Sequence, residues 1–112
     1  MAVVQFDQRY LMTKIMLCCS AGMSTSMFVE KMREAAESRS EEVEVEAFGA
    51  SHFDEQVACF DVVLLGPQVK YMLNDLKLRA AEYAVPVEAI SPVDYGTMNG
   101  AKVLGFALSL TA

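Results

Sequence analysis

Cys19 is the residue in this sequence whose surroundings best suit covalent chemistry. It follows a short apolar run at 15–18 and precedes a loop of small residues, Ser-Ala-Gly-Met-Ser-Thr-Ser at 20–26. The backbone N–H groups of such a loop can approach an anion closely, and its hydroxyl groups add further donors. The same partial positive charge would stabilise a thiolate at Cys19. A thiolate inside an anion-binding loop indicates that Cys19 takes up a phosphoryl group covalently.

The loop is expected to supply its backbone N–H groups to the phosphoryl oxygens, with help from its hydroxyl side chains. The candidate phosphate-binding residues are Ser20, Ala21, Gly22, Met23, Ser24, Thr25 and Ser26. Met23 is expected at the tip of the loop, where it could contact a partner protein.

Two better-known classes of phosphate-binding loop fit this sequence less well. Nucleotide hydrolases need the lysine of G-x-x-x-x-G-K-[ST], and this loop has no such lysine, so binding of ATP or GTP is unsupported. Low-molecular-weight tyrosine phosphatases use a cysteine, five residues and then an arginine, and Thr25 stands at that arginine position. Without a bidentate guanidinium, negative charge in a transition state is stabilised less strongly. The loop therefore suits carriage of a phosphoryl group better than rapid hydrolysis.

The elements that must position this loop are a strand before it and an amphipathic helix after it. The run at 15–18 reads as a strand buried on both faces. Apolar residues recur behind the loop at helical spacing, at Met27, Phe28, Met32 and Ala35 or Ala36. We expect Ser24 or Thr25 to cap this helix, its charged residues (Arg33 among them) to point outward, and its end to lie near Ser38.

Strand and helix patterns alternate along the rest of the chain. Further strands are predicted at 43–48, 60–65 and 85–90, a short helix at 51–58 with Ser51 as its cap, a helix at about 68–83, a loop at 91–96, and a last helix at about 98–109. The second and fourth strands are expected at the sheet edges, because one alternates with glutamates and the other has an early proline.

This alternation predicts an α/β fold, a four-stranded parallel sheet of order 2-1-3-4 with helices on both faces. Ligands of such sheets bind beyond the carboxyl ends of the strands, where the winding reverses. The loop after the first strand is expected at that point. Motif and topology therefore predict the same site.

Several other side chains have expected positions near this site or away from it. Gln68 follows the third strand, where it either donates a hydrogen bond to phosphate or simply faces solvent, and Tyr95 follows the fourth strand and could line the rim. Cys18 is expected in the core, because alternation points it away from Cys19, and Cys59 is expected in the core or in helix-end packing. We assign no role to His52, and we expect no metal and no cofactor.

The composition bounds the class of protein. Of 112 residues, the acidic ones exceed the basic ones to give a formal net charge of −6, which argues against nucleic-acid or anionic-lipid binding. No secretory signal or membrane-spanning stretch is visible, and three cysteines make neither a disulfide framework nor a zinc site, so a cytosolic location is expected. We expect one domain at 12–112, monomeric by default, and an N-terminal extension at 1–11 that is partly disordered and functionally silent.

Several of these motifs together resemble the enzyme IIB subunit of the bacterial sugar phosphotransferase system, lactose/cellobiose/chitobiose type. The similar stretches are 19–26, 29–33, 45–48, 61–68, 71–73 and 95–100, so the resemblance covers residues 13–110. It implies that Cys19 receives a phosphoryl group from a histidine of enzyme IIA and passes it to a sugar held by the membrane transporter, enzyme IIC. It leaves the sugar open among cellobiose, chitobiose, lactose and other β-glycosides, because specificity belongs to the membrane partner.

The residues themselves leave three alternatives open. A cysteine-dependent phosphatase would use a similar loop, although Thr25 argues against it. A thiol redox protein could use Cys18 and Cys19, although adjacent cysteines bridge poorly. A regulatory module that only binds phosphate would tolerate the loss of Cys19.

Overall fold

The computed structural model describes residues 12–19 and 23–111, and it describes the side chains of these residues except those of 23–26. The predictions for the extension at 1–11 and for Ser20, Ala21 and Gly22 lie outside the described residues. The predictions for the side chains of Met23, Ser24, Thr25 and Ser26 do so as well.

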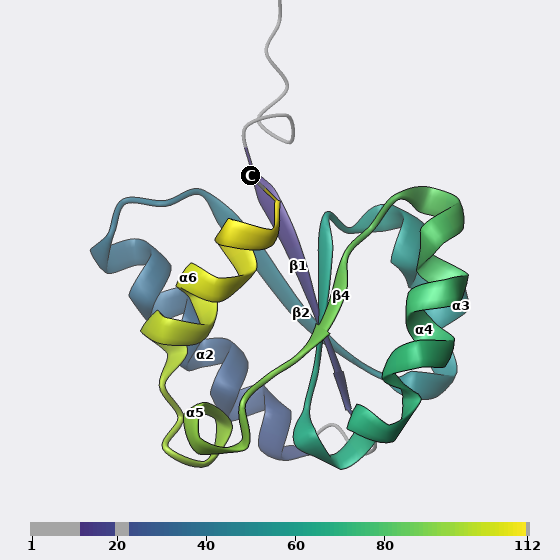
Figure 1. Cartoon of the computed structure of the whole chain (residues 1–112). Coiled ribbons are helices and arrows are strands. Elements are labelled where there is room, and N and C mark those ends of the chain that lie inside the picture. Colours follow the sequence, from purple (N-terminus) through teal and green to yellow (C-terminus); the bar gives the residue numbers. More distant parts are fainter. Residues whose placement is uncertain (1–11, 20–22, 112) are drawn as a thin grey trace, which may run out of the picture.

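The sheet has four parallel strands in the order β2-β1-β3-β4 (Figure 1). They are β1 (Thr13–Cys19), β2 (Val43–Gly49), β3 (Val62–Leu65) and β4 (Val87–Ala89). In the register of the sheet, Leu17 of β1 lies between Ala47 of β2 and Leu64 of β3. The predicted strand order is confirmed, and so are the edge positions of the second and fourth strands.

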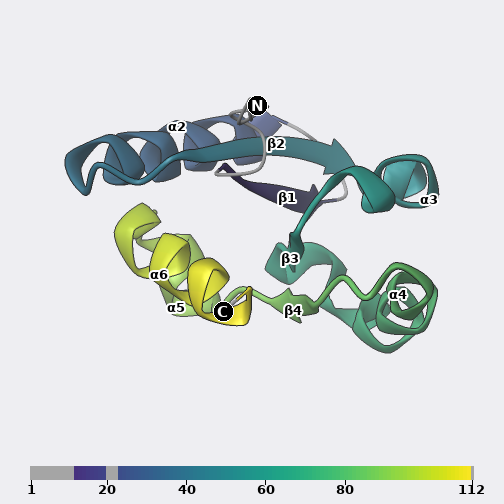
Figure 2. The ribbon, with the colours of Figure 1, turned by 90° about the horizontal axis from the view of Figure 1, so that it is seen from above.

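Helices cover both faces of the sheet, as predicted (Figures 1 and 2). One face carries α2 (Met23–Ser38), α5 (Pro92–Gly96) and α6 (Gly100–Leu110). The other carries α3 (Phe53–Gln56) and α4 (Leu73–Ala80), together with the 3-10 turns η1 (Ala50–His52), η2 (Val57–Cys59), η3 (Pro67–Met72) and η4 (Ala81–Tyr83).

Two hydrophobic cores result, one on each face, and β1 contributes to both. Ile15 and Leu17 pack with the α2 and α6 side chains, whereas Met16 and Cys18 pack with α3 and α4. Successive strand residues point to opposite faces, which explains this division. The prediction that Cys18 belongs to the core is therefore confirmed.

Two predicted helix caps are wrong. Helix α2 already begins at Met23, so Ser24 and Thr25 lie within its first turn and not at its N-cap. Ser51 lies inside η1, and the cap position before that turn is Gly49, which makes no side-chain hydrogen bond. In both places the helical conformation begins earlier along the chain than the apolar spacing indicates.

Other boundaries also differ from prediction. The helix expected at 68–83 is broken at Val69, whose φ of −120° departs from helical geometry while its side chain enters the core. The loop expected at 91–96 contains α5, which Pro92 favours by fixing φ at the first helical position. The last helix starts at Gly100 because Asn99 caps it, its side-chain oxygen accepting from the Lys102 N–H at 3.1 Å.

Candidate functional site

Cys19 is the last residue of β1, and it lies where three features of the fold meet. It pairs with Gly49 of the edge strand β2, and α2 begins at Met23, directly after the segment 20–22. The connection after β1 runs to one face of the sheet, and the connection after the neighbouring β3 runs to the other. The thiol is therefore at the carboxyl edge of the sheet, where the winding reverses.

The Cys19 side chain is shielded in this conformation, with 1 % of its surface exposed. Its Sγ lies 4.0 Å from the carbonyl oxygen of Phe48, which is a long, weak S–H···O contact. A donor group can reach Sγ only after local movement of the atoms around it. This shielding was not predicted from the sequence.

Cys18 differs from Cys19 in orientation, and its pKa is raised. Its side chain is fully buried in the core under α3 and α4. Burial raises the pKa of the Cys18 thiol from 9.0 to about 11, and the negative charge of a neighbouring Cys19 thiolate adds to this effect. Cys18 therefore stays protonated near neutral pH. This geometry disfavours a redox pair of the two cysteines.

The amino-terminal end of α2 provides the positive end of a helix dipole beside Cys19. Its first turn contains no acidic residue that would neutralise this charge. Phe28 and Val29 anchor the second turn in the core, whereas Met27 is 60 % exposed. The inward orientation predicted for Met27 is thus wrong, and Val29 takes its place, because the apolar spacing allowed either phase of the helix.

Gln68 lies at the same carboxyl edge of the sheet, beside Gly66. A Cβ atom at Gly66 would come 2.6 Å from Gln68 Oε1, so the Gln68 amide folds back into the space that glycine leaves free. The Gly66 N–H donates to the Cys18 carbonyl at 2.9 Å, which ties this turn to the end of β1. Gln68 itself is exposed.

Tyr95 of α5 is half-buried and packs against the beginning of α2. Its ring stacks on that of Phe28, with 5.0 Å between the ring centroids and 11° between the ring planes. The structure therefore brings Tyr95 to the amino-terminal part of α2, although the sequence placed it only on a loop after the fourth strand.

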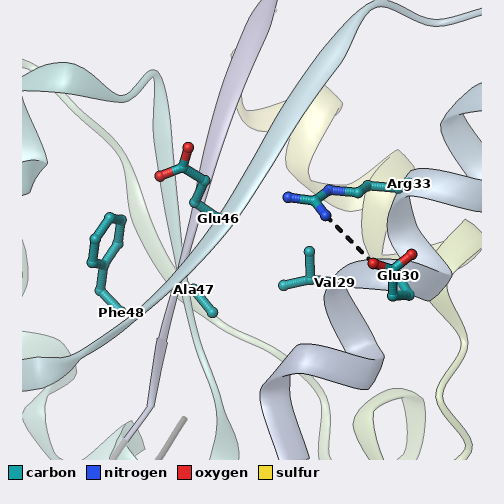
Figure 3. A pocket seen from close by; sticks show the side chains of 6 residues that line it. All are labelled: Val29, Glu30, Arg33, Glu46, Ala47 and Phe48. Atoms are coloured by element: carbon teal, nitrogen blue, oxygen red, sulfur yellow. Dashed lines mark hydrogen bonds and ion pairs between the residues drawn. The ribbon is translucent and has the colours of Figure 1, made fainter. Parts of the chain in front are cut away.

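A hollow of about 330 Å³ lies between α2 and the open edge of β2 (Figure 3). Arg33 of α2 reaches across it, and its Nη2 donates to the Val45 carbonyl of the edge strand at 2.8 Å. Its Nη1 lies 3.5 Å from a Glu30 carboxylate oxygen. The helical pattern predicts an outward-facing Arg33, and no signal in the sequence identifies its partner Val45.

Two further residues lie away from the site. Cys59 is exposed at the end of η2, so of its two predicted places, the core and helix-end packing, the core is wrong. His52 is also exposed, and its Nδ1 lies 3.5 Å from a Glu55 carboxylate oxygen. Among the helices that the structure describes, none is both long and apolar enough to cross a membrane.

The fold and the position of Cys19 define a class, the parallel α/β domains with a cysteine at the switch point of the sheet. The family model for the lactose/cellobiose-specific IIB subunit of the phosphotransferase system (PTS) matches residues 14–106. The chain therefore belongs to this IIB family.

Curated relatives are similar in sequence to this chain along nearly their whole length. The oligo-beta-mannoside-specific EIIB component of Bacillus subtilis is 43 % identical over 99 residues, which cover 88 % of this chain and 96 % of the relative. The galactose-specific EIIB component of Lactococcus lactis subsp. cremoris is 41 % identical over 101 residues, 86 % of this chain and 94 % of the relative.

Solved structures share the fold. The cellobiose-specific IIB component of Borrelia burgdorferi superimposes with a TM-score of 0.75 at 40 % identity, covering 89 % of this chain and 92 % of that one. The lactose-specific IIB domain of Streptococcus pneumoniae superimposes with a TM-score of 0.79 at 19 % identity, covering 89 % and 98 %. The predicted fold class and family are therefore confirmed.

Proposed function

We propose that this chain is a cytosolic phosphoryl carrier, which accepts a phosphoryl group on Cys19 from a phosphohistidine of enzyme IIA and passes it to a sugar held by the membrane enzyme IIC. The observation that carries this proposal is the position of Cys19 as the last residue of β1, shortly before the start of α2, in a chain of the IIB family. A thiol at that point faces the positive end of a helix dipole.

The first step transfers the group from nitrogen to sulfur. The Cys19 thiolate attacks phosphorus in line, an S–P bond forms, and the N–P bond breaks with its electron pair returning to the imidazole. Backbone N–H groups of residues 20–26 hold the three equatorial oxygens as charge builds on them. In the second step a sugar hydroxyl attacks the same phosphorus, and the Cys19 thiolate leaves while the hydroxyl proton goes to a base of the transporter.

Gln68 and Tyr95 border the site in this proposal, and Met23 contacts the partner protein. The Gly66 N–H in the turn before Gln68 donates to the Cys18 carbonyl, and this link between the turn and the end of β1 supports the proposal that the Gln68 amide donates to a phosphoryl oxygen. The chain acts as a monomer that meets IIA and IIC in turn. Neither a metal nor a nucleotide takes part in these steps.

The sugar is proposed to be a β-linked glycoside of the cellobiose or chitobiose kind. The curated relatives are named for oligo-beta-mannoside, galactose and cellobiose, so the family serves several sugars. The residues of this chain that surround Cys19 contact phosphate and partner, and the choice of sugar lies with IIC.

A two-stage transfer experiment tests the proposal. The chain is first labelled from phosphoenolpyruvate through the general phosphotransferase proteins and IIA, and then mixed with membranes that contain IIC and a candidate sugar. The label should appear on the chain and then move to the sugar. Release of free phosphate without any sugar would favour a phosphatase, and label that stays on the chain with every IIC and sugar would contradict the carrier function.

A further inference from the structure

The segment from Ser91 to Lys102 contacts α2 at two places, in the second turn of the helix and at its middle. The Tyr95 ring stacks on Phe28 in the second turn of the helix (ring centroids 5.0 Å apart), and α5 lies beside this end of α2 in Figure 1. One turn further along, Gly100 lies directly against the α2 backbone. A Cβ atom there would be 2.5 Å from the Lys31 carbonyl carbon. Two contacts on successive turns fix both the position and the rotation of the helix start.

The segment is itself held by a network of local hydrogen bonds. The Asn99 N–H donates to the Asp94 carbonyl at 2.9 Å, and the Thr97 hydroxyl donates to the Val93 carbonyl at 2.9 Å. Met98 has a positive φ of 53°, a conformation that costs a non-glycine residue on the order of 1 kcal/mol. Such strain persists only where the surrounding contacts over-determine the backbone. The segment is thus a rigid support.

We propose that Tyr95 is a positioning residue, which acts through Phe28 to hold the first turn of α2 in place against Cys19. This inference rests on the phosphoryl-carrier function proposed above. The N–H groups of the first turn can serve the phosphoryl group only if the helix start keeps its place relative to Sγ. A displacement of about 1 Å at such a site can cost on the order of 100-fold in rate. The stack on Phe28 lies in the turn that directly follows this first turn.

The test compares three variants in a Cys59→Ser background, which removes the exposed thiol. Tyr95→Leu removes the planar stack, and Tyr95→Phe keeps it. Leu108→Ala is the control: it weakens the same hydrophobic core at a position in α6 about two turns after Gly100. Two quantities are measured well below the unfolding temperature: the single-turnover rate of phosphoryl uptake from phosphorylated IIA, and the pH profile of Cys19 alkylation.

Tyr95→Leu should slow phosphoryl uptake at least tenfold and move the alkylation profile to higher pH. Tyr95→Phe should restore both quantities most of the way, and Leu108→Ala should lower only the stability. The inference is overturned if Tyr95→Leu matches the background protein in both quantities, or if Leu108→Ala changes them equally. Absence of uptake in the background protein would instead refute the proposed function, and the alkylation profiles would still decide the role of Tyr95.

Discussion

A Cβ atom placed on Gly100 would lie 2.5 Å from the carbonyl carbon of Lys31, so the first turn of α6 rests directly on the backbone of α2. The Lys31 oxygen and the Met32 nitrogen lie at 2.6 and 2.8 Å from the same point. No flexible side chain can yield there, because all three neighbours are backbone atoms. Glycine is therefore the residue type that allows this helix pair to close.

Gly100→Ala should lower the free energy of unfolding by about 2 kcal/mol or more, because α6 must move away from α2. Gly105→Ala is the matched control within the same helix, since its Cβ would meet only an Arg39 guanidinium nitrogen at 3.7 Å. That substitution should raise the stability by up to about 1 kcal/mol through helix propensity. Urea unfolding of both variants measures this. Equal stabilities of the two variants would contradict the close contact.

The sheet could be predicted from the sequence because the burial of each strand determines its pattern of apolar and polar residues. The run Val62–Leu65 is continuously apolar, and strand β3 is central, whereas the alternating glutamates beside Val45 mark an edge. The position of Cys19 could be predicted in the same way, because an apolar strand pattern ends just before a loop of small residues and a helical pattern begins after it. The strand order and the edge of the sheet that carries the candidate site could therefore both be predicted.

The features that could not be predicted from the sequence depend on contacts between residues that are distant along the chain. The apolar spacing allows either Met27 or Val29 to face the core, and only the packing of α2 on the sheet decides between them. The stack of Tyr95 on Phe28 joins residues far apart in the sequence, and so does the bond from Arg33 to Val45. No local pattern encodes these contacts.

Cys18 should make the stability fall at alkaline pH. Burial, assisted by the charge of a Cys19 thiolate, raises its pKa from 9.0 to about 11, so the folded protein holds this proton more tightly than the unfolded chain. The resulting stability is fully present below pH 9 and is lost as the pH rises towards 11. This gap in pKa corresponds to roughly 3 kcal/mol at most.

The measurement is urea unfolding of wild type and Cys18→Ala at several pH values from 8 to 11. Cys18→Ala should be less stable near pH 8 because it leaves a cavity, but its stability should fall less steeply above pH 9. Two curves that fall in parallel across this window would contradict a raised Cys18 pKa.

The exposure of Cys59, together with the burial and raised pKa of Cys18, predicts the order in which these two cysteines react. Limited alkylation of the native protein at pH 7.5 should modify Cys59, which is exposed, and leave Cys18 untouched. Peptide mass mapping identifies the modified residues, and denatured protein provides the control in which both react. Early modification of Cys18 in the native protein would show that its side chain is not held in the core under α3 and α4.

In the proposed function, Cys19 carries the phosphoryl group. The most direct test is the intact mass of wild type, Cys19→Ser and Cys18→Ala after incubation with phosphorylated IIA. Wild type and Cys18→Ala should each gain one phosphoryl group, with the lability expected of a thiophosphate, and Cys19→Ser should gain none. Uptake that persists in Cys19→Ser, or that disappears in folded Cys18→Ala, would contradict the assignment of Cys19 as the acceptor. No uptake by wild type from any active IIA would contradict the carrier function itself.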